Sequence, residues 1–217
     1  MPIVGPERLD EVVRALLAGE VVAIPTDTVY GLAALPEDAA AVAALAALKG
    51  RSGQHPIAVL FDDIEAITPY VEDPLALRAL AGFWPGALTA VVRVPAGLAT
   101  AALTSLAPLG TLGLRQPDDE LARAVIRACG GALAVSSANR TGEPPALSAA
   151  EVAAAFGTGA NELDGLLVLD GGARPGGTAS TVVDMTAEPP AVLREGPLAA
   201  DAVLAALATL RDAEGER

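Results

Sequence analysis

The sequence has few residues of the types that carry most protein chemistry. Its 217 residues include one lysine (Lys49), one histidine (His55), one cysteine (Cys129) and one tryptophan (Trp84). One cysteine and one histidine cannot form a zinc cluster of Cys and His ligands, and one cysteine cannot close a disulfide within the chain. Histidine chemistry, if used, is limited to His55. The lack of a disulfide framework suits a reducing compartment, so we expect a cytoplasmic protein.

The sequence also lacks a secretory signal and an uninterrupted membrane span. Residues 1–13 contain no basic region followed by an apolar run. The longest uncharged stretch, residues 94–114, has about the ~20-residue length that a bilayer requires, but two prolines and three glycines interrupt it. A formal net charge of -13 repels nucleic acid and anionic membranes on average. We expect no membrane partner, and the sequence leaves direct contact with tRNA open.

The pattern of apolar residues predicts one α/β domain over residues 1–217. Hydrophobic residues make up 52% of the chain, and helix-like and strand-like segments alternate along it. Because the last third is rich in strands, we expect a mixed β-sheet flanked by helices. The predicted helices cover residues 6–17, 36–48, 62–70, 74–81, 118–129, 148–156 and 198–210. The predicted strands cover residues 21–24, 57–61, 87–94, 111–114, 132–135, 166–169, 180–183 and 191–193. The charged end, residues 211–217, is expected to fray.

Most polar residues of interest follow the predicted strands, where open α/β sheets commonly bind ligands. Hydroxyl, amide, glycine or cationic residues gather in segments 25–32, 49–56, 111–117, 136–139, 171–181 and 194–197. Taken singly, each segment also has a purely structural explanation. Segment 25–32 is equally consistent with a hydroxyl-capped turn that leads into a helix. Lys49 is consistent with a cation that interacts with the dipole at a helix C-terminus. Segment 171–181 is not a P-loop, because no Gly-Lys-Ser/Thr follows and a strand comes next.

Four candidate cations stand at or near the ends of these elements. They are Lys49, Arg51, Arg115 and Arg194. An acidic chain that gathers cations in this way is suited to a multiply charged anion such as a nucleotide.

In combination, these segments resemble the YrdC family of threonylcarbamoyl-AMP synthases. Seven motifs in the family's order carry the resemblance and span about residues 7–208: 25–32 (PTDTVYGL), Lys49-x-Arg51 with Pro56, 84–89 (WPGALT), 115–117 (RQP), 136–139 (SSAN), 180–184 (STVVD) and Arg194-x-Gly196. The resemblance implies a twisted α/β fold with a large, concave, positively charged cavity. The length corresponds to the single-domain form of the family, without the C-terminal domain of longer members.

The resemblance also implies a reaction and its partners. L-Threonine, bicarbonate or CO2, and ATP become threonylcarbamoyl-AMP and pyrophosphate, with Mg²⁺ held mainly by the ATP phosphates. The product serves the N6-threonylcarbamoyl modification of adenosine 37 in tRNA, by hand-over to tRNA threonylcarbamoyl transferase proteins. No metal site built from protein side chains is expected.

Roles for individual residues follow from the resemblance, position by position. Lys49 and Arg51 are expected to be catalytic. The threonine site is expected to contain Thr28, Arg115, Ser137 and Ser180. The ATP site is expected to contain Lys49, Arg51, His55, Thr111, Asn139 and Arg194.

The sequence departs from the family pattern at two positions. Leu60 stands where some members have a histidine near the substrate threonine, so that histidine contact is absent. Leu147 replaces a hydroxyl residue, and Ser148 beside it is the candidate substitute.

Two other functions remain open at this stage. The first is a module that binds double-stranded RNA or tRNA in a basic cavity, although the net charge and the single lysine weigh against it. The second is a carbamoyl transferase that acts through carbamoyl-adenylate. Related domains of that kind accompany acylphosphatase-like and zinc-finger segments, which this sequence lacks.

Overall fold

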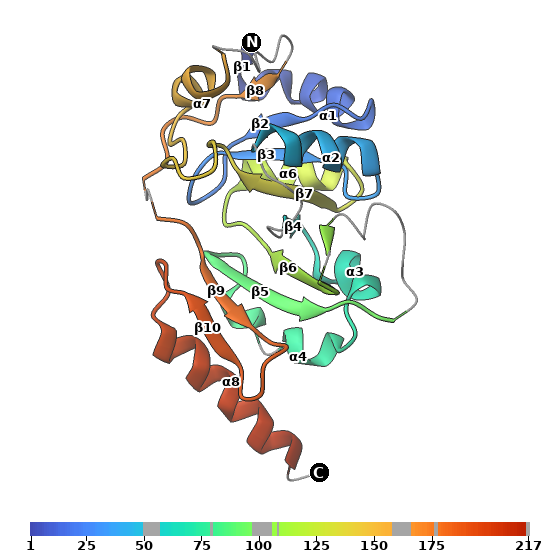
Figure 1. The fold of residues 1–217 in the computed structure, drawn as a ribbon, viewed down its shortest axis with the longest axis vertical. Coiled ribbons are helices and arrows are strands. Elements are labelled where there is room, and N and C mark those ends of the chain that lie inside the picture. The colour runs from blue at the N-terminus through green and yellow to red at the C-terminus, as the bar shows by residue number, and fades with distance from the viewer. Residues whose placement is uncertain are drawn as a thin grey trace.

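A computed structural model describes residues 1–49, 57–78, 80–96, 106–107, 109–157, 166–175 and 178–215. Helices and strands alternate along the chain, as predicted (Figure 1). The strands are β1 (Ile3–Val4), β2 (Val22–Ile24), β3 (Gly31–Ala34), β4 (Ala58–Phe61), β5 (Leu88–Arg93), β6 (Thr111–Arg115), β7 (Ala132–Ser137), β8 (Leu167–Leu169), β9 (Thr181–Asp184) and β10 (Ala191–Arg194). The α-helices are α1 (Leu9–Leu17), α2 (Ala39–Leu48), α3 (Ile64–Ile67), α4 (Pro74–Arg78), α6 (Glu120–Ala128), α7 (Ala149–Phe156) and α8 (Ala200–Gly215). Short 3-10 helices cover Pro6–Arg8, Thr68–Tyr70 and Ala81–Phe83.

The strands form one mixed sheet, in agreement with the prediction. Their order is β1-β8-β2-β3-β7-β4-β6-β5-β9-β10. The pairs β1–β8, β2–β8, β4–β6 and β5–β9 are parallel, and the other neighbours are antiparallel. Because parallel neighbours require crossover connections, segments far apart in the sequence meet in the sheet.

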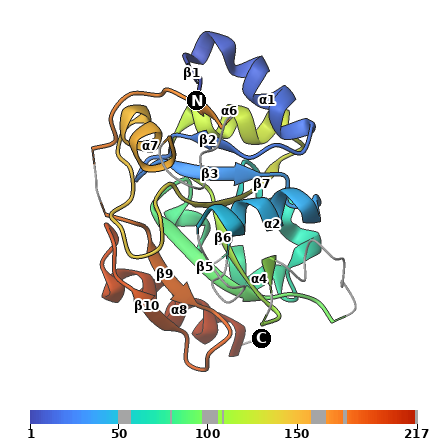
Figure 2. The same cartoon turned by 45° about the horizontal axis from the view of Figure 1, so that its top comes forward.

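Helices cover the two faces of the sheet unequally (Figures 1 and 2). On one face, α1 and α6 pack against buried residues of β2, β3, β7 and β8. On the other face, a larger apolar cluster joins α2, α7 and α8 to both halves of the sheet. Buried side chains of β4 and β7, Leu60 and Val135, lie on the α1–α6 face near the middle of the sheet. This face continues beyond the two helices towards β6, β5 and β9.

Four of the described helices begin at side chains that cap their free backbone N–H groups, among them α3, where Asp63 accepts from Glu65. Asp38 accepts from Ala40 and Ala41 at the start of α2, and Asp119 accepts from Ala122 at the start of α6. In α7, Ser148 accepts from the backbone of Glu151 at 3.2 Å, and the Glu151 carboxylate accepts from the backbone N–H of Leu147. The predicted start of this helix and its acidic partner are therefore confirmed.

Several predicted boundaries were wrong. Residues 31–34 form the central strand β3 rather than leading into a helix, and β1 was not predicted. All four residues of β3 are buried, so the strand lacks the alternation of apolar and polar residues that marks a half-buried strand. The predicted helix 62–70 is a short helix followed by a 3-10 turn that contains Pro69. Helix α8 ends at Gly215 and not at the predicted Leu210.

Among the described residues, no helix is both long enough and apolar enough to cross a membrane.

Cys129 is expected to react slowly with thiol reagents near neutral pH. It caps the C-terminus of α6, and burial raises the pKa of its thiol to about 11. The thiolate is the reactive form, so the rate of modification by an aromatic disulfide should rise steeply only as the pH approaches that value. The raised pKa stabilises the folded chain below the ordinary thiol pKa of 9.0, and this contribution is lost as the pH rises towards 11. Rapid labelling of the folded chain at pH 7 would contradict this prediction.

Candidate functional site

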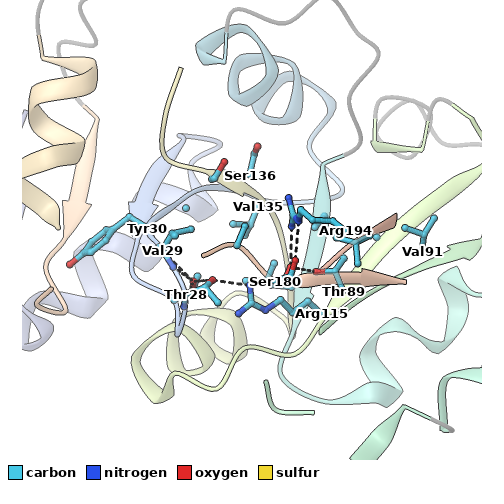
Figure 3. A pocket seen from close by; sticks show the side chains of 18 residues that line it. Thr28, Val29, Tyr30, Thr89, Val91, Arg115, Val135, Ser136, Ser180 and Arg194 are labelled. Carbon is cyan, nitrogen blue, oxygen red and sulfur yellow. Dashed lines mark hydrogen bonds between the residues drawn. The ribbon is translucent and has the colours of Figure 1, made fainter. Parts of the chain in front are cut away.

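A pocket of about 260 Å³ lies on the sheet face that α1 and α6 leave open. Its walls come from the loop between β2 and β3, from the residues just before β9 and from seven strands: β3, β4, β5, β6, β7, β9 and β10. Figure 3 shows the side chains that line it. The described residues that line it include two arginines and several hydroxyls but no carboxylate: Thr26, Thr28, Val29, Tyr30, Gly31, Ala58, Leu60, Thr89, Val91, Gly113, Arg115, Val135, Ser136, Ser137, Ala179, Ser180, Val182 and Arg194.

Small residues on alternate strand positions hollow the floor of the pocket. Residues two apart in a strand share a face, so Ala58 and Leu60 of β4 lie beside Gly113 and Arg115 of β6. A Cβ atom at Gly113 would lie 3.3 Å from Cγ2 of Thr89. Any side chain at Gly113 would therefore press on the floor of the pocket.

Arg115 ends β6 at one side of this floor and is almost completely buried. Its Nη2 donates to Oδ1 of Asp27 at 2.6 Å, Nη1 donates to the Thr28 hydroxyl at 3.0 Å, and Nε donates to the Gly86 carbonyl at 3.1 Å. Burial lowers the pKa of the guanidinium, and Asp27 opposes that shift. A guanidinium has five N–H donors, and these described contacts use three of them, so two remain to bind an anion.

The loop that presents Thr28 is held by its own hydroxyl groups. Thr26 donates from Oγ1 to the Val29 carbonyl at 2.6 Å, and the same oxygen accepts from the backbone N–H groups of Thr28 and Val29. The turn predicted from residues 25–32 is therefore present. It leads into strand β3 instead of capping a helix, and it places two threonine side chains in the pocket wall.

Ser180, Thr89 and Arg194 form a second polar group across the floor (Figure 3). The hydroxyls of Thr89 and Ser180 lie 2.8 Å apart, and Arg194 donates from Nε to the Ser180 carbonyl at 3.0 Å. Burial lowers the pKa of Arg194, and the charge of Arg115 lowers it further. None of the ion pairs between described residues involves Arg194. An anion bound in the pocket would offset the cost of burying the Arg194 charge and its repulsion by Arg115.

Lys49 lies behind the pocket, with only 1% of its surface exposed. Its Nζ donates to the Ser137 carbonyl at 2.6 Å, to the Asn139 Oδ1 at 2.7 Å and to the Ser137 hydroxyl at 3.2 Å. The Ser137 hydroxyl in turn donates to Asn139 Oδ1 at 2.6 Å. Lys49 thus fixes Ser137 at the end of β7 and Asn139 just beyond it.

The structure brings most of the predicted site residues together. Thr28, Arg115, Ser137, Ser180 and Arg194 line one pocket, and Lys49 and Asn139 adjoin it through Ser137. Thr111 begins β6 and lies roughly 13 Å from Arg115 along the strand, at ~3.3 Å per residue, outside the pocket lining. Arg51 and His55 lie outside the described residues. The roles assigned to all these residues stay predictions.

Two polar partners of predicted site residues were not themselves identified from the sequence as site residues. Asp27 pairs with Arg115, and Thr89 bonds to Ser180. Both lie inside motifs that were recognised, the segments 25–32 and 84–89. In the sequence, the only sign that these two residues belong to the site is that each is a polar residue within a recognised motif.

Of the two departures from the family pattern, one faces the pocket and one does not. Leu60 lines the pocket and presents an apolar surface there. Leu147 is not among the lining residues, and its carbonyl accepts from the backbone of Arg174. The hydroxyl of Ser148 is engaged in capping α7, so it takes no part in the pocket in this arrangement.

Comparisons with known proteins identify the family of the chain. The family model Sua5/YciO/YrdC, described as telomere recombination, matches residues 14–196. The chain is 41% identical over 181 residues to a threonylcarbamoyl-AMP synthase of Chromohalobacter salexigens, covering 82% of this chain and 93% of the relative. It is 34% identical over 205 residues to the synthase of Bacillus subtilis, covering 92% of this chain and 56% of the relative.

Among solved structures, the chain is similar to P. abyssi Sua5 complexed with L-threonine, with a TM-score of 0.83 at 29% identity, covering 95% of this chain and 61% of that chain. E. coli YciO shares the fold, with a TM-score of 0.76 at 23% identity, covering 90% of this chain and 95% of that one. This chain therefore spans most of its shorter relatives but only about three fifths of the longer ones. The chain belongs to the Sua5/YciO/YrdC family.

Proposed function

We propose that the chain synthesises threonylcarbamoyl-AMP from L-threonine, bicarbonate or CO2, and ATP, with release of pyrophosphate. Family membership supports the reaction, and relatives that carry the name of this synthase cover most of the chain. The observation that carries the proposal is the pocket with Arg115, Arg194 and several hydroxyls, because it combines fixed cations with donors for a small polar substrate. The product would serve tRNA modification in the cytoplasm, after hand-over to threonylcarbamoyl transferase proteins.

In this proposal, threonine binds beside Arg115. The two remaining N–H donors of the guanidinium bind the substrate carboxylate as a fork. Thr28 and Ser180 place hydroxyls nearby for the polar groups of the amino acid. Leu60 and Val135 supply apolar surface for its methyl group.

ATP lies towards Arg194 and Ser137. Arg194, which has no ion-pair partner in the described part of the chain, binds phosphate oxygens, and Lys49 holds Ser137 and Asn139 in place for the nucleotide. Arg51 and His55 belong to the same proposed site. Mg²⁺ bound to the phosphates would neutralise charge on the pyrophosphate leaving group. In the proposal, the ion is held mainly by these phosphates.

The chemistry that remains needs positioning more than proton transfer. The neutral threonine amine and bicarbonate form a carbamate anion with loss of water. A carbamate oxygen then attacks the α-phosphorus, and the bond to pyrophosphate breaks. The attacking carbamate is already an anion, so no strong general base is required for that step. Fixed cations stabilise the charge that develops on the phosphoryl oxygens. The pocket holds the short-lived carbamate beside ATP, so that the two react before the carbamate loses CO2.

The decisive experiment measures pyrophosphate release from ATP with threonine and bicarbonate, together and singly. The proposal expects release only when both are present, and an adenylated threonylcarbamate in the product by mass spectrometry. Release with carbamoyl phosphate but without threonine would assign the chain to carbamoyl transfer instead. Salt-dependent binding of tRNA without ATP turnover would make it an RNA-binding module.

A further inference from the structure

Arg174, in the glycine-rich segment before β9, lies outside the pocket lining but makes a dense set of polar contacts. Its Nη1 donates to Oδ2 of Asp119 at 2.7 Å and to the Thr26 carbonyl at 3.3 Å. Its Nε donates to the Gly172 carbonyl at 3.2 Å, and its Nη2 donates to the Gly171 carbonyl. The two side chains of the Arg174–Asp119 ion pair are only 12% and 13% exposed. A nearly buried ion pair with this many partners fixes the chain around it.

The partners of Arg174 connect three segments, one of which contributes Thr26 and Thr28 to the pocket. Asp119 caps α6 through its other oxygen, which accepts from Ala122 at 2.8 Å. The guanidinium carbon lies 5.9 Å from the ring centroid of Tyr30, within the range of a cation–π contact. The phenol of Tyr30 is turned away from the polar residues of the pocket, and it donates to the Gly172 carbonyl at 2.9 Å (Figure 3). The ends of β2, β8 and β6 therefore meet around one guanidinium.

Two arginines hold the loop of residues 26–28. From the pocket, Arg115 bonds to the carboxylate of Asp27 and the hydroxyl of Thr28. Arg174, which is not part of the lining, bonds to the carbonyl of Thr26. A substrate carboxylate that binds Arg115 shares this guanidinium with Asp27, which weakens the hold of Arg115 on the loop. The contact with Arg174 does not depend on the substrate.

We propose that Arg174 is a positioning residue for amino-acid binding. With Asp119 as its counterion, it keeps residues 26–28 in place when the substrate carboxylate engages Arg115. The inference rests on the proposed function. It assigns a role to the glycine-rich segment that the substrate contacts do not explain.

The test replaces Arg174 in the full chain and compares steady-state constants for the two substrates. Arg174→Met should raise the threonine KM ~10-fold or more, since a hydrogen bond that involves a charged group corresponds to a factor of ~10–100 in an equilibrium constant. The ATP KM should change less than about twofold, because Arg174 does not touch the side of the pocket near Arg194. Arg174→Lys keeps a charge for Asp119 but lacks the planar fork, so it should raise the threonine KM while retaining the melting temperature.

Arg127→Met is the matched control. Arg127 lies on α6, the helix that Asp119 caps, and pairs with Asp62 at 2.8 Å, but it is exposed and has no contact with residues 26–28 among its described bonds. This variant should keep the threonine KM of the wild type.

Titration calorimetry of L-threonine, without ATP, separates the two possible failures. If the wild-type chain binds no threonine, the proposed function fails and the role of Arg174 fails with it. If the wild type binds threonine and Arg174→Lys binds it equally well, the role of Arg174 alone is overturned. An equal rise of both KM values would also overturn it, because that result indicates general loosening of the fold. Should Arg174→Met not fold, Arg174→Lys decides the outcome.

Discussion

Replacing Lys49 with methionine is expected to lower threonine-dependent pyrophosphate release by a factor of ~100 or more. The ammonium is completely buried and holds the Ser137 carbonyl, the Ser137 hydroxyl and Asn139 Oδ1. Methionine fills similar space but donates nothing, so the side chains of Ser137 and Asn139 lose their fixed orientation. Loss of one preorganised electrostatic contact in an active site costs a factor of ~100–1000 in turnover.

The same substitution should also lower stability. Each buried acceptor left without a donor costs ~1–3 kcal/mol, and each kcal/mol lowers the melting temperature of a chain this size by ~2–4 °C. Thermal unfolding followed by circular dichroism measures this loss beside the rate. Lys49→Arg keeps the charge, but the planar guanidinium does not fit a site built for a compact ammonium, so its activity should also fall. Wild-type turnover in Lys49→Met would remove Lys49 from the proposed reaction.

Replacing Arg115 with methionine is expected to raise the threonine KM by a factor of ~100, because the substrate carboxylate loses its cation. Turnover at saturating threonine should fall less than kcat/KM. The variant should also lose ~3–5 kcal/mol of stability, since it leaves the carboxylate of Asp27 buried without its partner. The side chains of this pair are 8% and 14% exposed, so solvent replaces little of the lost interaction.

The double variant Asp27→Asn with Arg115→Met separates the two effects. Removing both charges should restore most of the stability, because no buried charge is left unpaired. The threonine KM should stay as high as in the single variant. A double variant that recovers threonine affinity would show that the carboxylate binds elsewhere, and chemical denaturation of the single and double variants measures the stability difference.

Much of the fold follows from local signals in the sequence. The acids of residues 36–38 marked the start of α2, and Asp38 caps that helix. Ser148 and Glu151 marked the start of α7 in the same way. Strand β3 escaped notice because all its residues are buried between β2 and β7, and a strand buried on both faces shows no alternation.

Much of the site also followed from the sequence, but its internal pairing did not. Arg115 at a strand end and the hydroxyls of residues 25–32 were recognisable as polar groups beside apolar strands. The side-chain partners of Arg115 lie almost ninety residues earlier in the chain, and Asp119 lies 55 residues before Arg174. Such pairs depend on strand order and register, which single segments do not encode. They are also the pairs that turn separate polar residues into one site.

The burial of Lys49 bears on which amine captures CO2. A primary amine adds CO2 only as the free base, with its lone pair available. Lys49 is the sole lysine of the chain, and its nitrogen donates to three acceptors inside the protein. With the lysine locked in this way, no lysine side chain competes with the amino acid for the electrophile or becomes carbamylated itself. In the proposed reaction, the burial of the Lys49 amine thus favours addition of CO2 to the α-amine of the substrate.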